Sequence, residues 1–348
     1  MIKIHEGKAV IYTDSGHKDK ISKQLEVFYN PVMKTNRDLT IIFMNAISNL
    51  KLNKRKLVVG LPLAGSGIRG IRFALETNVV KTIYMNDYDK KAIKNMKKNL
   101  RLNKVKAKTS VNDANIFMLE NKGFDFIDLD PFGSPNPFLD AAIKRLSRNG
   151  FLAITATDTA PLAGTFPKTC LWKYWSKNYL TPEKHEIGLR ILIRKVQLIA
   201  SQQERALIPV FSYAKDHYYR VIFICKKSKT SAVKIIENNK MYTPNFFKKE
   251  IGPLWFGQLQ DKKILKEMIK LSKENKLFLK VLLEEEKVNA VGFIDIHEFM
   301  KKTKKQGLSH NKVIEKLKAK SFKASRTHFS YKGIKTDCEL IKLKKIIK

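Results

Sequence analysis

Strand-like and helix-like segments alternate from about residue 55 to residue 225, and this alternation constrains the fold more than any other feature of the sequence. Apolar runs typical of buried strands occur at 56–61, 81–89, 107–115, 124–130 and 151–158, and two closing strands that would form a hairpin follow at 207–214 and 218–227. Segments with helical spacing of apolar residues, such as 185–204, separate several of these runs. The pattern predicts an α/β fold, in which helices cover both faces of a mostly parallel sheet.

A glycine-rich turn, LAGSGIRG, follows the first of these strands. Gly65 and Gly67 would allow backbone N–H groups to approach a ligand and would allow positive φ angles. About 20 residues later, Asp87 ends the next strand, where a carboxylate can bind both hydroxyls of a ribose. The turn and the acid together predict a nucleoside cofactor at the carboxyl edge of the sheet.

Two further acids end later strands. Asp113 ends the third strand and would lie beside an adenine ring, to which Ala114 would offer its backbone N–H. Asp130 ends the fourth strand. The alternative for each acid alone is a helix cap or a turn residue. Acids at three successive strand ends would face one crevice, because the carboxyl ends of parallel strands meet at one edge.

The stretch DLDPFGSP places an acid, a proline and an aromatic ring together at Asp130, Pro131 and Phe132. A carboxylate can accept a hydrogen bond from the exocyclic amine of a nucleobase and take up developing positive charge. Proline has no N–H, so the preceding carbonyl can face the amine, and the ring can stack on the base. The alternative is a strand-ending turn with a core phenylalanine. S-adenosylmethionine fits this arrangement better than a nicotinamide or a flavin.

The net charge of +36 favours a polyanionic partner, and about half of it follows Lys226. The three cysteines form no C-x-x-C pair, which argues against a cysteine zinc site. No apolar run is long enough to span a membrane, and no secretory signal is evident.

The tail after Lys226 has two or three amphipathic helices followed by a strand–turn pattern at 324–337, as a winged-helix-like module would have. WKYWSKNY, at 172–179, is either an RNA-stacking platform or a half-buried aromatic helix.

Beyond these single features, the chain resembles the tRNA (guanine-26-N2)-dimethyltransferase family, a family of class I methyltransferases that depend on S-adenosyl-L-methionine. The resemblance covers most of the chain and is carried by VFYNPVMKTNRDLT, LAGSGIRGIRFALE, NDYD, DLDPFGSP, TATDTAPLAG, EIGLRILI, DHYYRV and GPLWFGQL, in the family's order. It implies a Rossmann-like sheet, a smaller basic α+β C-terminal domain, and methylation of the guanine N2 amine to N2-methyl- and N2,N2-dimethylguanosine.

The resemblance also implies roles for particular residues. The cofactor would contact Arg37 and Arg69, with Asp87 on its ribose and Asp113 and Ala114 on its adenine; Asp130 would be the catalytic carboxylate, and Phe28 and Phe132 would hold the flipped guanine between them. We expect a catalytic domain at 1–225, with a lid at 1–50, and a tRNA-binding domain at 226–348. We also expect a cytoplasmic monomer.

Two departures from the family pattern matter. The strand before the glycine turn lacks the acid that many such enzymes carry near its end, and the family's cysteine cluster is missing, so we predict no metal. Two alternatives remain at this point: a DNA amino-methyltransferase, and a non-catalytic RNA-binding protein on a methyltransferase fold.

Overall fold

The structure is a computed structural model that describes residues 2–13, 29–53, 55–288, 290–304 and 307–347. The chain divides into two compact units. The first contains residues 1–155, 222–227 and 270–272, and the second contains 156–221, 228–269 and 273–348. The predicted division into a catalytic domain at 1–225 and a tRNA-binding domain at 226–348 stays a prediction.

From residue 57 to residue 156 strands alternate with helices, as the sequence predicted. In chain order the elements are β1 (Ile2–Glu6), β2 (Ala9–Thr13), η1 (Pro31–Met33), α1 (Lys34–Asn49), β3 (Leu57–Leu61), α2 (Ile68–Glu76), β4 (Val80–Asp87), α3 (Lys90–Leu102), β5 (Lys108–Val111), α4 (Ala114–Glu120), β6 (Phe124–Leu129), η2 (Asn136–Phe138), α5 (Leu139–Arg145) and β7 (Leu146–Ala156).

The elements after residue 156 are mainly helices, with two long strands and several short ones. They are α6 (Thr159–Leu162), α7 (Pro167–Tyr174), α8 (Lys184–Ser201), β8 (Arg205–Lys215), β9 (Tyr218–Lys227), α9 (Lys229–Glu237), β10 (Asn239–Tyr242), β11 (Ile251–Trp255), α10 (Lys262–Leu271), α11 (Lys276–Lys287), β12 (Ile294–Asp295), α12 (Ile296–Thr303), α13 (His310–Ala319), β13 (Ala324–Arg326), β14 (Gly333–Thr336) and α14 (Leu340–Ile346).

The main sheet has seven strands in the order β5-β4-β3-β6-β7-β9-β8. The pairs from β5 to β7 are parallel, which confirms the predicted sheet and brings the carboxyl ends of these strands to one edge. All six residues of β6 are buried, as expected for a central strand covered on both faces. Two residues join β8 to β9, so these neighbouring strands form the predicted hairpin.

The fifth strand is longer than the sequence indicated. It was expected at 151–158, whereas β7 begins at Leu146 and ends at Ala156. The polar residues Ser147, Arg148 and Asn149 conceal its start, because the register with β6 shifts there and takes them out of the regular alternation.

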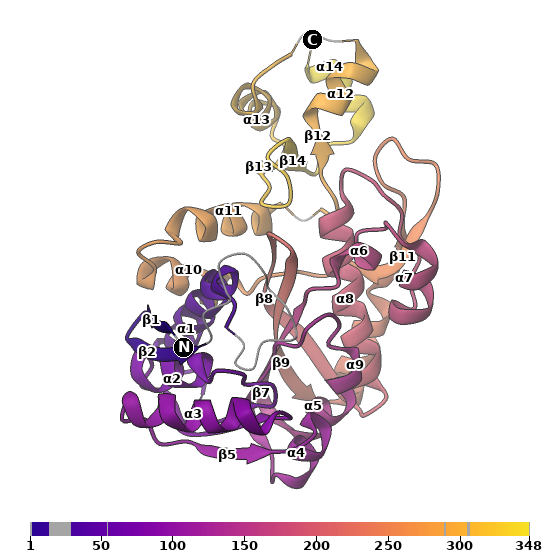
Figure 1. Cartoon of the computed structure of the whole chain (residues 1–348). Coiled ribbons are helices and arrows are strands. Elements are labelled where there is room, and N and C mark those ends of the chain that lie inside the picture. Colours follow the sequence, from indigo (N-terminus) through magenta and orange to yellow (C-terminus); the bar gives the residue numbers. More distant parts are fainter. Residues whose placement is uncertain (1, 14–28, 54, 289, 305–306, 348) are drawn as a thin grey trace. The chain divides into compact units, whose positions relative to one another are not determined.

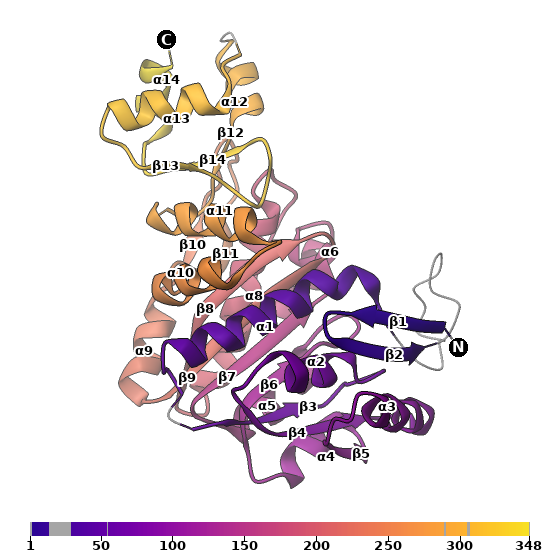
Figure 2. The same cartoon turned by 90° about the vertical axis from the view of Figure 1, so that its left-hand side faces the viewer.

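The N-terminal hairpin of β1 and β2 packs beside α2 and α3 (Figure 2). A column of asparagines spaced four residues apart on α3 bonds the backbone of β2. Asn99 Oδ1 accepts from Tyr12 N at 2.8 Å and Asn103 Oδ1 accepts from Val10 N at 2.9 Å, while Asn95 Nδ2 donates to Tyr12 O at 3.0 Å. These side chains satisfy an edge that would otherwise lack backbone partners. The predicted lid function of residues 1–50 stays a prediction.

The end of the chain forms a small module with a core of its own (Figure 1). Its antiparallel sheet has the order β12-β14-β13, and α12, α13 and α14 pack against it through Phe299, Val313, Leu317 and Leu343. The arrangement is α+β, as predicted. β12 was missed because two residues are too few to show a periodic pattern.

Candidate active site

The glycine turn between β3 and α2 has the backbone that the sequence predicted. Gly65 and Gly67 have φ angles of +51° and +82°. A Cβ on Gly67 would lie 2.7 Å from Met96 Cγ, so the position requires glycine for space as well as for conformation. Gly65 N donates to Asp87 Oδ2 at 2.8 Å, which ties the turn to the end of β4.

Asp87 and Asp113 follow two adjacent parallel strands. Burial raises the pKa of Asp87, and the backbone N–H groups of Asp89 and Gly65 partly oppose this rise. Asp113 caps α4: its Oδ1 accepts from Asn115 N at 2.8 Å and from Ile116 N at 3.2 Å. Ala114 is the first residue of that helix. The structure therefore brings these residues to the predicted edge, and their contacts with a cofactor stay predictions.

Arg69 organises the end of β6. Its Nη1 donates to Asn36 Oδ1 at 2.9 Å and to Asp128 Oδ2 at 3.2 Å, and its Nη2 donates to Asp130 Oδ2. The Asp128 side chain is fully buried, whereas 21% of the Asp130 side chain is exposed. Arg69 was predicted to contact the cofactor; here it holds the proposed catalytic carboxylate, and a cofactor contact stays a prediction.

Arg37 lies in a second buried network. Its Nε and Nη2 donate to the two oxygens of Glu6 at 2.7 Å and 2.5 Å. Arg72 Nη1 and the Tyr29 hydroxyl donate to the same carboxylate, at 2.7 Å and 2.8 Å. Burial and the negative charge of Glu6 raise the pKa of Tyr29 to about 12, so the phenol remains a donor at neutral pH. The charge of Arg37 is thus balanced by Glu6 within the protein.

A small cavity of about 60 Å³ opens between these two networks and the glycine turn. Its lining includes Tyr29, Arg37, Ser66, Arg69 and Asp130. Ser66 Oγ is buried there with no hydrogen-bond partner among the residues that the structure describes, so it is available to a bound ligand.

The motif around Asp130 is only partly enclosed. Pro131 is buried, and Phe132 is 45% exposed at the surface of the same loop. Phe28, the other ring predicted to hold a base, lies outside the described residues.

The sequence analysis assigned no role to several residues around the cavity, among them Glu6, Tyr29, Asn36 and Asp128. A signal existed for Asp128, because residues two apart on a strand lie on the same face, so that Asp128 and Asp130 share a side. No comparable signal marked Glu6, which meets Arg72 across 66 residues of chain.

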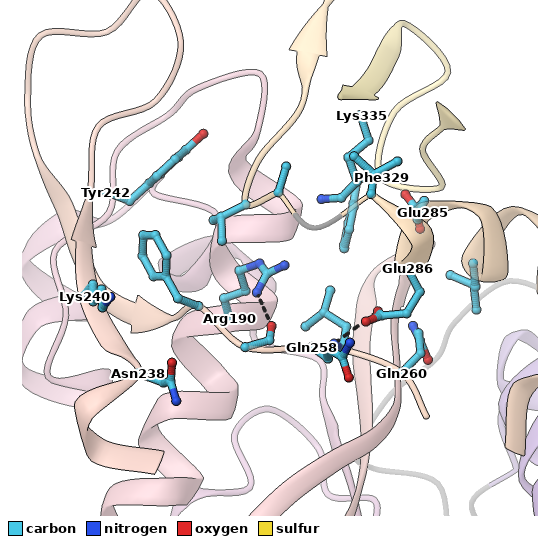
Figure 3. Close-up of a pocket in the computed structure, with 17 residues that line it drawn as sticks. Arg190, Asn238, Lys240, Tyr242, Gln258, Gln260, Glu285, Glu286, Phe329 and Lys335 are labelled. Atoms are coloured by element: carbon cyan, nitrogen blue, oxygen red, sulfur yellow. Dashed lines mark hydrogen bonds between the residues drawn. The ribbon is translucent and has the colours of Figure 1, made fainter. Parts of the chain in front are cut away.

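A larger cavity of about 390 Å³ lies in the second unit (Figure 3). Three of its charged residues pair with other side chains: Arg190 and Lys335 with Glu186, at 2.9 Å and 2.6 Å, and Glu285 with His328 at 2.5 Å. In the part of the chain that the structure describes, its lining has no buried side-chain polar atom without a partner. We therefore assign the chemistry to the smaller cavity.

No group of three or more His, Cys, Asp or Glu is placed to hold a metal ion within the described residues. None of the helices described is both long enough and apolar enough to cross a bilayer.

The parallel sheet, the glycine turn and the acid after the next strand define a Rossmann-like methyltransferase that uses S-adenosyl-L-methionine. Trm1 from Pyrococcus horikoshii, solved in complex with S-adenosyl-L-methionine, matches with a TM-score of 0.88 and 32% identity over 100% of both chains. The sequence model described as N2,N2-dimethylguanosine tRNA methyltransferase matches residues 7–248 and 245–348, and the chain belongs to this family.

Curated relatives agree with this assignment. The tRNA (guanine(26)-N(2)/guanine(27)-N(2))-dimethyltransferase of Aquifex aeolicus is 36% identical, over 96% of this chain and 92% of its own length. The tRNA (guanine(26)-N(2))-dimethyltransferase of Methanocaldococcus jannaschii is 37% identical, over 97% of this chain and 96% of its own.

The residues at the smaller cavity fit the cofactor. S-adenosyl-L-methionine carries a sulfonium, an ammonium and a carboxylate, so its net charge is positive. Arg69 lies between the carboxylates of Asp128 and Asp130, which leaves that cluster with a net negative charge. The unpartnered Ser66 hydroxyl and the glycine turn add polar groups at close range.

Proposed function

We propose that this protein transfers methyl groups from S-adenosyl-L-methionine to N2 of guanine 26 in tRNA, forming N2-methyl- and N2,N2-dimethylguanosine. The observation that carries the proposal is the position of Asp130. It directly follows β6 and lines the small cavity, and Arg69 donates a hydrogen bond to its carboxylate. The names of the two relatives support the substrate, and the Aquifex name adds guanine 27 as a second position to test.

The chain's own residues have distinct tasks in this proposal. The cofactor supplies an electrophilic methyl group. Gly65, Gly67, Ser66 and Asp87 would bind it, with Arg37, Arg69, Asp113 and Ala114 as further contacts. These groups hold the cofactor and exclude water, so that the methyl group faces the acceptor amine.

The acceptor side depends on the loop after β6. The guanine must leave its stack to reach the site. Phe132, whose ring is partly exposed, would stack on one face of the base, and Phe28 on the other. Asp130 would accept a hydrogen bond from the amine, and its own carbonyl can face the amine because Pro131 offers no N–H.

We further propose that residues 226–348 supply most of the affinity for tRNA, and that 1–225 supply the chemistry. The concentration of positive charge after Lys226 supports this division. We also expect a cytoplasmic monomer without a bound metal. A truncation at residue 226 is a poor test, because Lys335 is buried against Glu186 and its removal would leave that carboxylate with one fewer partner.

The Asp130→Asn variant tests the proposed chemistry. Asparagine keeps the shape of the side chain but not the charge, and Asp128 remains as the ionic partner of Arg69, so the fold should survive. We expect methyl incorporation into tRNA to fall on the order of 100-fold or more, with S-adenosyl-L-methionine still bound. Mass spectrometry of tRNA nucleosides and calorimetric titration of the cofactor provide the two measurements.

Asp140→Asn is the matched control, since Asp140 is exposed and pairs with the exposed Lys144 on α5. Activity of Asp130→Asn within about threefold of wild type would remove the carboxylate from the mechanism. Methylation of duplex DNA in place of tRNA would favour a DNA amino-methyltransferase. Failure to bind the cofactor at all would favour a non-catalytic RNA-binding protein.

A further inference from the structure

Helix α7 presents two tryptophans to solvent. Cys170 and Tyr174, four residues apart, bury one side of the helix, while Trp172 and Trp175 are 68% and 45% exposed. Trp172 lies in the last turn of the helix and Trp175 is its C-cap, so the two exposed indoles lie at the same end of α7. Two large apolar side chains that stay in contact with water do not stabilise the fold by burial, and such exposed apolar groups point to an interaction with a partner.

The backbone at Trp175 strengthens this point. Trp175 caps the helix in the left-handed region, with φ 55° and ψ 37°. A non-glycine residue costs about 1–2 kcal/mol there, and helices usually place glycine at such a position. Lys195 Nζ packs against the ring, so part of this cost is offset within the protein, but 45% of the residue stays exposed. The exposed part of the indole adds nothing to this contact and is accessible to a ligand.

The surface is held rigidly. The Tyr174 hydroxyl donates to Asp158 at 2.7 Å, and Lys173 Nζ pairs with the same carboxylate at 2.6 Å. Arg194 Nη1 donates to Trp175 O at 2.9 Å, directly at the strained residue. A rigid ring loses little conformational entropy when a ligand stacks on it.

The positive charge around α7 indicates what kind of partner the tryptophans bind. No Asp or Glu occurs between Thr159 and Pro182, whereas Lys168 and Lys177 are exposed on either side of the tryptophans. Lys195 Nζ lies 2.9 Å from the centroid of the Trp175 ring and covers one of its faces. Aromatic faces beside fixed positive charges match unpaired nucleotides, which combine flat bases with phosphates.

We propose that Trp172 and Trp175, with Lys168 and Lys177, form a surface that stacks on unpaired nucleotides of the tRNA other than the target guanine. This inference rests on the proposed function and deepens it. Stacking tolerates any base, so the surface positions the substrate and does not select its sequence. Loss of the rings should therefore weaken tRNA binding with little change in kcat at saturating tRNA.

Three variants of the full-length protein separate stacking from fold effects. Trp172→Leu keeps apolar bulk but removes the ring, whereas Trp172→Phe keeps a ring. Trp175→Gly removes the indole and its contact with Lys195, and it suits the left-handed backbone, so the gain in backbone conformation offsets the lost contact and the variant should fold. We expect Trp172→Leu and Trp175→Gly to raise the Kd and KM for tRNA on the order of 5- to 100-fold, and Trp172→Phe to raise them less than about threefold.

The readouts are the tRNA Kd by filter binding, KM and kcat for methyl incorporation, the Kd of S-adenosyl-L-methionine, and the sedimentation mass. An unchanged tRNA Kd for Trp172→Leu and Trp175→Gly in an active enzyme would show that these tryptophans do not bind tRNA. Equal losses of tRNA affinity for Trp172→Leu and Trp172→Phe would show that the ring does not act by stacking. A change in sedimentation mass without a change in tRNA Kd would assign the surface to a second copy of the chain. Failure of the wild-type protein to methylate tRNA counts against the proposed function instead.

Discussion

Glu6 lies buried where Arg37, Arg72 and Tyr29 converge. Burial by itself would favour the protonated carboxyl, but the hydrogen bonds and positive charge of Arg37, with further hydrogen bonds from Tyr29 and Arg72, outweigh it and lower the pKa of Glu6 to about 2. In the unfolded chain this carboxyl titrates near 4.5. Its contribution to stability is therefore present above about pH 4.5 and is lost as the pH falls toward 2.

Glu6→Gln should remove this acid dependence. We expect the free energy of unfolding at pH 7 to fall by about 3 kcal/mol, because Arg37 would lose its carboxylate partner, whereas Arg72 keeps Asp38 and Glu76. The difference in stability between pH 7 and pH 3 should shrink in the variant. Urea unfolding at the two pH values measures both effects. Glu204→Gln, at an exposed pair with Lys229, should leave both values unchanged, and an equal acid dependence in Glu6→Gln and wild type would refute the assignment.

At the scale of single elements, α2 depends on the turn that starts it. Gly67 caps the helix in the left-handed region and lies against Met96, while Arg69 and Arg72 project from the first two turns of the helix into the two buried networks. A shift of the glycine turn would therefore displace both arginines together.

The Gly67→Ala variant tests how much this turn contributes to stability. We expect the free energy of unfolding to fall by about 2–4 kcal/mol, from backbone strain together with the contact to Met96. Gly133→Ala is the matched control: Gly133 also has positive φ, +77°, but an added Cβ there meets no described atom within 4 Å. It should lose only about 1–2 kcal/mol. Chemical denaturation compares the two, and equal losses would show that the contact with Met96 contributes nothing.

At the scale of the whole molecule, we expect the net charge of +36 to dominate the interaction with tRNA. Lysines matched to phosphates release counterions when tRNA binds, so affinity must fall as salt rises. Cofactor binding, which involves few charges, has no such dependence. The two affinities therefore separate the electrostatic hold on the RNA from the chemistry of the site.

We expect the tRNA Kd to rise about a thousandfold between 50 and 200 mM salt if roughly six phosphates are neutralised. The Kd of S-adenosyl-L-methionine should change by less than about twofold over the same range. Filter binding and calorimetry measure the two quantities. A tRNA Kd that is flat in salt would show that the basic surface does not contact phosphates.

Much of this protein follows from local sequence. Apolar runs of strand length, separated by helical spacing, predicted the parallel sheet. Asp87, Asp113 and Asp130 reached one edge because each follows the end of a parallel strand. Their positions depend only on short-range pattern and on a general rule of sheet topology, so no knowledge of distant contacts was needed.

Only the tertiary structure decided how the charges pair. Glu6 meets Arg72 across 66 residues, Asn103 on α3 meets the β2 edge across 93, and Lys335 meets Glu186 across 149. Sixty-eight basic residues offer many possible partners for each acid, and the local sequence does not indicate which of them will form the pair. The choice depends on which pairs the packed backbone buries together, because burial is what makes an unpaired charge costly.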